Sequence, residues 1–240
     1  MSAAKITRSN SWWELSATWL PSTILPHLSL LDRRNVLEVG SFEGGSTTWF
    51  MRHFLAHEES RLTVVDTWQD TRDPECYGDE DYSTGNFDAV LQRFLSNVRN
   101  SPNSEKVRAI RGDSASALAS LLPTASSSFD FIYVDGSHRA SEVFLDVSLS
   151  FRLLKRGGIM LLDDYKWVGE RQSGQRPSDA RVEGGCGAIS QMAELDITAA
   201  IDSVLASVPG GVEVLHCGYQ LMVRKLGESV DVKAPEQLII

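Results

Sequence analysis

The stretch that decides the fold is FDFIYVDGSHRASEVFLDVSLSFRLLKRGGIMLLDDY, residues 129–165. It opens on an apolar run, and a second apolar run, residues 159–162, ends on two adjacent aspartates. Between the runs, hydrophobic side chains recur at helical spacing: Ala140, Val143, Phe144, Val147, Phe151 and Leu154. Gly157 and Gly158 are expected to end this helix. Strand, helix and strand in this order are typical of a parallel sheet covered by helices.

The same alternation runs through the preceding hundred residues. Strands are expected at 35–40, 61–68 and 106–114, and the fourth at 129–138. Helices are expected at 46–57 and 87–98, and a short one at 115–123 that ends at Pro123. Residues 212–225 predict two strands around Cys217 and Gly218, which we interpret as a hairpin. The fold class is therefore α/β.

Three segments do not fit the alternation. Residues 1–33 contain Trp12, Trp13 and Trp19 and are expected to form a helical cap on the domain that spans 34–240. Residues 69–86 and 168–187 are polar and rich in turn formers. Long loops in compact domains are often functional, so 168–187 is predicted to be an active-site lid. Trp12, Trp13, Tyr165 and Trp167 are candidates for a substrate wall, although packing is the alternative.

Composition restricts the class of protein. The chain has 240 residues and a net charge of −9, without a run rich in Lys or Arg, which argues against a nucleic-acid partner. No apolar run approaches the length of a membrane span, and the start of the chain lacks a signal-peptide core. Three dispersed cysteines favour reduced thiols. We expect a cytoplasmic protein of one domain, with a homo-oligomer through the N-terminal tryptophans left open.

Acidic side chains gather where the predicted strands end. Ligands of open α/β sheets bind beyond the carboxyl ends of the strands. The residues delivered there, strand by strand, are Glu38 and Gly40, Asp66, Asp113 and Ser114, Asp135 and His138, and Asp163 and Asp164. Five strands that end in acid favour a ligand with a positive centre.

The first turn, GSFEGGST at 40–47, is rich in glycine and precedes a helix. It lacks the G-x-G-x-x-G pattern of dinucleotide sites, because Phe42 and Glu43 interrupt it, so a nicotinamide enzyme is disfavoured. Asp66 lies where an acidic residue accepts hydrogen bonds from a ribose diol. The alternative is that the glycines form a simple turn and that Asp66 caps a strand.

Taken together, four motifs resemble class I S-adenosylmethionine-dependent methyltransferases: VLEVGSFEGGSTTWF, LTVVDTW, RGDSASAL and residues 129–165. D-G-S-H followed by G-G-I-x-x-x-D-D-Y is closest to the metal-dependent O-methyltransferases of the macrocin and mycinamicin type, distant relatives of catechol O-methyltransferase. The resemblance covers about residues 35–192. It implies a Rossmann-like, seven-stranded, mostly parallel sheet with a C-terminal antiparallel hairpin.

The resemblance also implies roles for residues. The cofactor S-adenosyl-L-methionine would be held by Glu38, Gly40, Ser41, Phe42, Gly44, Ser46, Asp66, Thr67, Asp113, Ser114 and Asp135. Within this set, Asp66 would bind the ribose, and Asp113 with Ser114 would reach the adenine. Asp135, Asp163 and Asp164 resemble divalent-metal ligands, Asp135 is also a catalytic candidate, and His138 resembles the general base. Phe42 departs from the family, where glycine is common.

The chemistry of these residues supports the same hypothesis. Carboxylates without a nearby cysteine suit Mg²⁺ or another hard divalent cation. A cation would lower the pKa of a bound hydroxyl, and a neutral His138, expected to start the helix that runs to Leu154, could accept its proton. The alternatives are that the aspartates form a solvated turn and that His138 is an ordinary surface residue.

We therefore expect metal-assisted methyl transfer to a hydroxyl of a small molecule, such as a sugar or phenolic group of a secondary metabolite. One alternative is a metal-independent methyltransferase that acts on nitrogen or a carboxylate. Another is a non-catalytic partner protein that binds S-adenosylmethionine.

Overall fold

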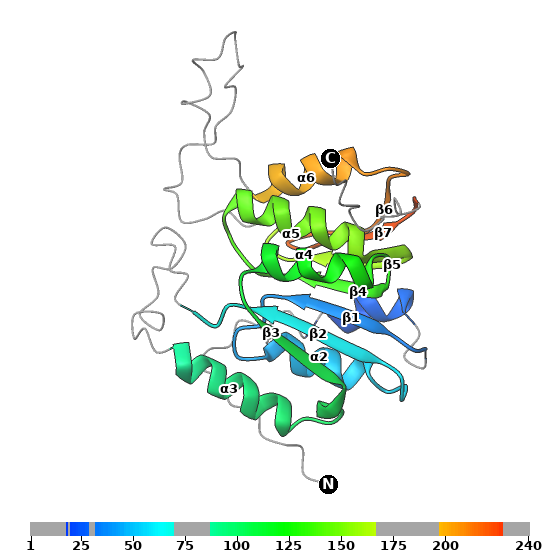
Figure 1. Ribbon diagram of the computed structural model, residues 1–240. Helices are drawn as coiled ribbons and strands as arrows, with labels where there is room; N and C mark the ends of the chain where they lie inside the picture. The colour runs from blue at the N-terminus through cyan, green and yellow to red at the C-terminus, as the bar shows by residue number, and fades with distance from the viewer. Residues whose placement is uncertain (1–17, 19, 29–31, 70–86, 167–196, 228–240) are drawn as a thin grey trace, which may run out of the picture.

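The structure is a computed structural model that describes residues 18, 20–28, 32–69, 87–166 and 197–227. Its centre is a seven-stranded sheet with the order β3-β2-β1-β4-β5-β7-β6 (Figure 1). The strands are β1 (Asn35–Val39), β2 (Arg61–Asp66), β3 (Val107–Arg111), β4 (Phe129–Val134), β5 (Leu154–Leu162), β6 (Val212–Cys217) and β7 (Leu221–Lys225). The first five run parallel, whereas β7 is antiparallel to β5 and β6. The predicted fold class and hairpin are confirmed.

Helices cover both faces of the sheet (Figure 1). The helices are α2 (Gly45–Phe54), α3 (Phe87–Arg99), α4 (Ser114–Ala125), α5 (Ala140–Leu153) and α6 (Ile197–Ser207), with the short 3-10 helices η1 (Leu25–His27) and η3 (Ser104–Lys106). Alternate strand residues face two separate cores. Leu37, Ile132 and Met160 pack with α4, α5 and α6. Phe131 and Leu161 pack with α2, α3 and residues 20–28.

Three helix ends differ from the sequence prediction, and the first is that of α2, which ends at Phe54 rather than at residue 57. Pro123 lies inside α4, which continues to Ala125. Proline removes only one hydrogen bond there, to the carbonyl of residue 119, at an exposed turn that is close to the helix end. The α5 helix ends at Leu153, so Gly157 and Gly158 do not stop it.

Those two glycines lie within β5. Leu154 already pairs with Phe129, and the register then shifts so that Ile159 pairs with Phe131. Gly157 has a φ of +76°, a left-handed backbone that a glycine adopts without strain. The glycines therefore allow an irregularity early in the strand rather than a helix cap.

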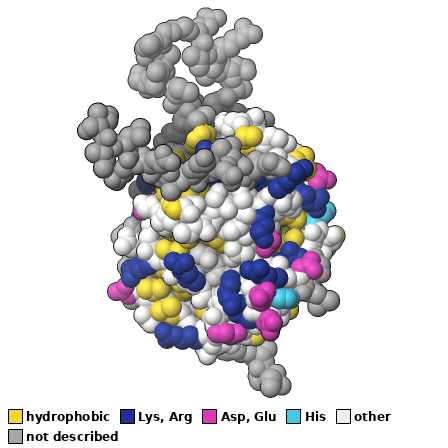
Figure 2. Space-filling model, turned by 45° about the vertical axis from the view of Figure 1, so that its right-hand side comes forward, with side chains coloured by type: hydrophobic (Ala, Val, Ile, Leu, Met, Phe, Trp, Pro, Cys, Tyr) yellow, Lys and Arg dark blue, Asp and Glu magenta, His cyan; other side chains and the backbone are white. Residues whose placement is uncertain are grey.

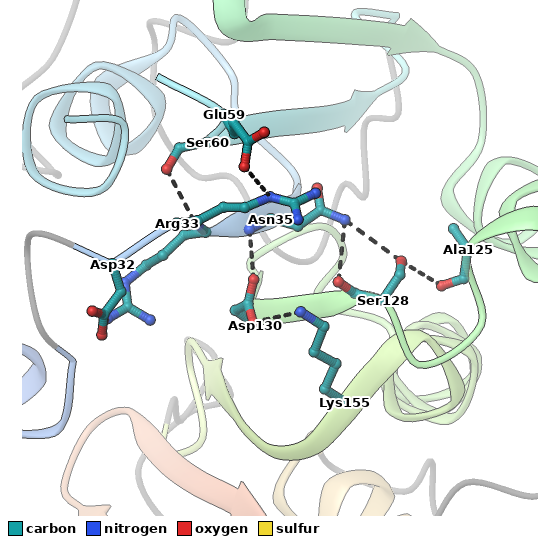
Figure 3. Close-up of polar contacts among 10 residues, drawn as sticks. Asp32, Arg33, Asn35, Glu59, Ser60, Ala125, Ser128, Asp130 and Lys155 are labelled. Atoms are coloured by element: carbon teal, nitrogen blue, oxygen red, sulfur yellow. Dashed lines mark hydrogen bonds and ion pairs between the residues drawn. The ribbon is translucent and has the colours of Figure 1, made fainter. Parts of the chain in front are cut away.

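Polar contacts fix the amino ends of the strands, which lie opposite the carboxyl ends where the site is predicted (Figure 3). Asp130 of β4 accepts hydrogen bonds from the backbone N–H of Asn35 at 2.7 Å and from Lys155 Nζ at 2.8 Å. Asn35 Nδ2 donates to the carbonyl of Ser128. These contacts tie β1, β4 and β5 together at one end, which sets the positions at which their other ends deliver side chains.

Several predictions fall outside the described residues. They concern the cap at 1–33, apart from residues 18, 20–28, 32 and 33, and the loops at 70–86 and 168–187. Trp12, Trp13, Trp19 and Trp167 belong to the undescribed part. Within the described part, no helix is long and apolar enough to cross a membrane. On the face seen in Figure 2, Lys and Arg side chains are interspersed with acidic and hydrophobic ones.

Candidate active site

The glycine-rich turn lies at the carboxyl end of β1 and leads into α2. Gly40 has a φ of +82°, and a Cβ added there would lie 1.9 Å from the carbonyl oxygen of Asp135. No other residue fits so close to the end of β4. Gly44, with a φ of +83°, forms the N-cap of α2. Gly40 therefore brings the turn against the residues that follow β4, and Gly44 lies against Phe94 of α3.

Glu38 lies one residue before the end of β1, with no exposed surface. Its carboxyl accepts hydrogen bonds from Ser46 Oγ and, at 2.6 Å, from Thr47 Oγ1. Burial raises the pKa of Glu38 to about 8, while the two hydroxyls act in the opposite direction. Glu38 thus binds the first turn of α2, and with it Ser46, in this structure.

Asp66, at the end of β2, is bonded to the same turn. Its Oδ2 accepts hydrogen bonds from the backbone N–H groups of Ser41 at 2.8 Å and Phe42 at 2.9 Å. Its Oδ1 accepts one from the N–H of Trp68 at 2.7 Å. The carboxylate therefore holds the glycine-rich turn closed, and Oδ1 still has a lone pair for a further donor, whereas Oδ2 also accepts from the Ser41 hydroxyl.

Glu43 does not add charge to the ligand side of the turn. Its carboxylate is buried and forms an ion pair with Arg93 Nε of α3. Asn97 Nδ2, also on α3, donates to the Glu43 carbonyl at 2.8 Å. The turn is thus fastened to α3, and Glu43 is a structural residue of the acid-rich rim.

Two of the predicted metal ligands face each other across neighbouring strands. Tyr133 pairs with Leu161, so two residues further on Asp135 and Asp163 lie opposite each other on the same face. The Tyr133 hydroxyl is within hydrogen-bonding distance of Asp135 Oδ2, at 2.9 Å, and of Asp163 Oδ2. Partial burial and the neighbouring carboxylates raise the pKa of Asp135 and of Asp163.

Asp164 turns in another direction. Its φ of +55° takes the chain out of the sheet, as two adjacent aspartates at one site require. Its Oδ2 lies 2.8 Å from His138 Nε2, and its Oδ1 accepts a hydrogen bond from the Tyr219 hydroxyl. His138 precedes α5, which begins at Ala140 rather than at His138. The result is a His–Asp pair beside the two facing carboxylates.

The donor set suits a hard cation, but the ligands are only partly assembled. Among the described residues, no three Asp, Glu, His or Cys side chains form a group that could hold a metal ion. Asp135 and Asp163 nevertheless face each other, and Mg²⁺ is commonly held by one or two carboxylates plus water and substrate oxygens. These two residues therefore fit the cation, and Asp164 would join them only after leaving His138.

The predicted adenine residues lie apart from this cluster. Asp113 caps α4 by accepting a hydrogen bond from the N–H of Ser116 at 2.9 Å, which lowers the pKa of Asp113. Ser114 is the first residue of α4. Thr67 follows β2, and its hydroxyl accepts from the N–H of Gln69. These residues lie beyond the ends of β2 and β3, toward the sheet edge formed by β3.

Sequence reasoning missed Tyr133, Tyr219 and Gln220. Strand parity could have found Tyr133, which lies two residues before Asp135 and so shares its face. Gln220 is fully buried and acts against the raised pKa of Asp163, although neither atom of its amide completes a hydrogen bond with the described residues. Both Tyr219 and Gln220 lie in the β6–β7 turn, whose register no local pattern reveals.

Comparison with known proteins agrees with this fold. Residues 37–165 match the family described as "Methyltransferase domain". The chain belongs to this methyltransferase family. The predicted resemblance to class I methyltransferases is thereby confirmed at the level of family and fold.

Individual relatives are more distant. O-methyltransferase hkm8 of Aspergillus hancockii is 27% identical over 135 residues, which are 56% of this chain and 44% of that protein. The chain spans about half of the length of the curated relatives it matches. The O-methyltransferase TomG from Streptomyces achromogenes, solved with SAM, has a TM-score of 0.55 at 14% identity, covering 92% of this chain and 82% of TomG. MycE from the mycinamycin biosynthetic pathway, solved with Mg and SAH, has a TM-score of 0.52 at 18% identity, covering 96% of this chain and 58% of MycE.

Proposed function

We propose that this protein is an S-adenosylmethionine-dependent O-methyltransferase that acts on a hydroxyl of a small molecule. The observation that carries the proposal is the convergence of Asp135, Asp163 and the His138–Asp164 pair beside the glycine-rich turn. Support comes from the family match, from a relative named as an O-methyltransferase, and from the fold shared with TomG, which was solved with SAM. A sugar or phenolic hydroxyl is the acceptor class we propose.

In this proposal, different residues bind the cofactor, accept the proton and hold the cation. The turn at Gly40–Gly44, held by Asp66 and Glu38, would position the cofactor. His138 would accept the proton of the acceptor hydroxyl, with its ring oriented by Asp164 at 2.8 Å. Asp135 and Asp163 would hold a divalent cation, which supplies charge stabilisation for the developing alkoxide when bound. Positioning of the acceptor oxygen in line with the methyl group would provide much of the rate.

The test uses metal-free protein, S-adenosylmethionine and a panel of catechols and glycosylated acceptors, with S-adenosylhomocysteine as the measured product. We expect product only after Mg²⁺ is restored. Asp163→Asn should lower turnover at least about 100-fold, while calorimetry should find the S-adenosylmethionine Kd changed by less than about twofold. Asp88→Asn, an exposed acid on α3, is the matched control and should leave both quantities unchanged. Equal loss of turnover and of cofactor binding in Asp163→Asn would contradict separate roles.

One observation favours a second candidate, methyl transfer without a metal. The Tyr133 hydroxyl already lies between Asp135 and Asp163, and Asp164 is already bonded to His138. A His–Asp pair can supply the base without a cation. Full activity after exhaustive EDTA treatment, lost in His138→Ala and in Asp164→Asn, would establish this candidate over the first.

A further inference from the structure

The described residues contain a buried acid that the proposed chemistry does not use. Asp146 lies on α5 with no exposed surface, and neither of its carboxyl oxygens completes a hydrogen bond with a residue that the structure describes. An ionised carboxylate without a donor is among the most unfavourable groups to bury. A residue of this kind in a well-packed helix calls for an explanation from its surroundings.

Asp146 lies under two turns at the carboxyl edge of the sheet. A Cβ added at Gly136, directly after Asp135, would lie 3.1 Å from Asp146 Oδ2. The Ser114 hydroxyl, at the start of α4, is close enough to lower the pKa of Asp146. Gly136 itself is exposed, so the buried carboxyl lies directly beneath a turn that faces solvent.

We propose that Asp146 is a positioning residue for the cofactor site: its buried carboxyl sets the spacing between Ser114 and Gly136, the two turns between which the nucleoside end of S-adenosylmethionine would lie. This inference rests on the cofactor dependence proposed above. The carboxyl acts in its neutral form, because burial disfavours the anion more than the nearby Ser114 hydroxyl favours it. Its size fills the space that a smaller side chain would leave empty under both turns.

The charges around Asp146 point the same way. Burial, and the neighbouring acids Glu142 on α5 and Asp113 at the start of α4, raise the pKa of Asp146 to about 7. As pH rises through 7, the carboxyl ionises beside these two charges, and the turns must move or admit water. The neutral, positioned form is therefore lost in the pH range in which cofactor binding can be measured.

The experiment is calorimetric titration with S-adenosylmethionine and with S-adenosylhomocysteine from pH 6 to pH 8.5. For the wild type we expect the Kd to rise about fivefold across this range. Asp146→Asn, a neutral side chain of the same shape, should bind as the wild type does at pH 6 and show no such rise. Asp146→Ala should weaken binding about tenfold at every pH, because it empties the space under both turns.

Glu142→Gln is the matched control. It removes a neighbouring charge without touching the carboxyl, so the midpoint of the Kd profile should move to lower pH. A structural role alone would change the melting temperature but would not move this midpoint. Coincident profiles for the wild type and Asp146→Asn overturn the inference while leaving the proposed function intact. Absence of cofactor binding by the wild type at every pH overturns both.

Discussion

Glu38 shows how a single residue can link the glycine-rich turn to pH. It has no exposed surface, and burial raises its pKa to about 8. An acid whose pKa is raised in the folded state keeps its proton there, so stability is greatest below the unfolded pKa and falls as pH rises towards 8. At neutral pH, Glu38 is therefore mostly a hydrogen-bonded neutral acid.

Replacement of Glu38 tests this. Glu38→Gln cannot ionise and keeps the size of the side chain, so its stability relative to the wild type should rise by on the order of 3 kcal/mol between pH 5 and pH 9. Urea unfolding at both pH values gives the two differences. A difference that stays constant with pH would show that Glu38 is ionised throughout the range.

Residue parity explains which parts of the site were predictable. The positions of Asp135, Asp163 and Asp164 follow from the strand ends, which a short apolar run before an acid marks clearly. The hydrogen bonds of Glu38 and Asp66 to their own turn do not follow, because they depend on how α2 packs on β1. The contact of Tyr219 with Asp164 does not follow either, because Tyr219 lies in a hairpin more than fifty residues after Asp164 and its position depends on the register of that hairpin.

At the scale of elements, α3 holds the glycine-rich turn in place. Arg93 forms an ion pair with the buried Glu43, and Asn97 donates to the Glu43 carbonyl. Sequence periodicity predicted the helix to within one residue, but not its task. The partners of α3 lie fifty or more positions earlier, and no local pattern encodes such contacts.

Arg93→Ala should therefore affect both stability and cofactor binding. Loss of a buried ion pair commonly costs 3–5 kcal/mol, and because Arg93 is one-third exposed we expect about 2 kcal/mol. The S-adenosylmethionine Kd should rise several-fold as the turn loosens, which calorimetry measures. Arg99→Ala, on an exposed position of the same helix, should change neither. Unchanged binding in Arg93→Ala would mean that Asp66 and Glu38 suffice to hold the turn.

Over the whole molecule, the carboxyl ends and the amino ends of the strands, which form two opposite edges of the sheet, have different roles. The carboxyl edge gathers acids whose pKa values are raised, an arrangement that costs stability. The amino edge gathers Asn35, Asp130 and Lys155 in contacts that satisfy one another. The alternation of strands and helices predicted this architecture well. The element ends at Pro123 and Gly157 were wrong because tertiary packing overrode the local signals.

The division between the edges predicts that stability and binding separate by location. Asp130→Ala removes the acceptor for the Asn35 N–H and for Lys155, whose side chain is 44% exposed, so we expect a loss of roughly 1–2 kcal/mol, mostly from the backbone contact. Lys155→Ala should cost less than about 0.5 kcal/mol. Neither variant should change the S-adenosylmethionine Kd, because both residues lie at the end of the sheet remote from the glycine-rich turn. Asp66→Asn, at the opposite edge, should raise the Kd, because the amide offers one acceptor oxygen where the carboxylate offers two. A raised Kd in Asp130→Ala would show that a change at the amino ends of the strands reaches the carboxyl ends through β4, which leads directly into Asp135.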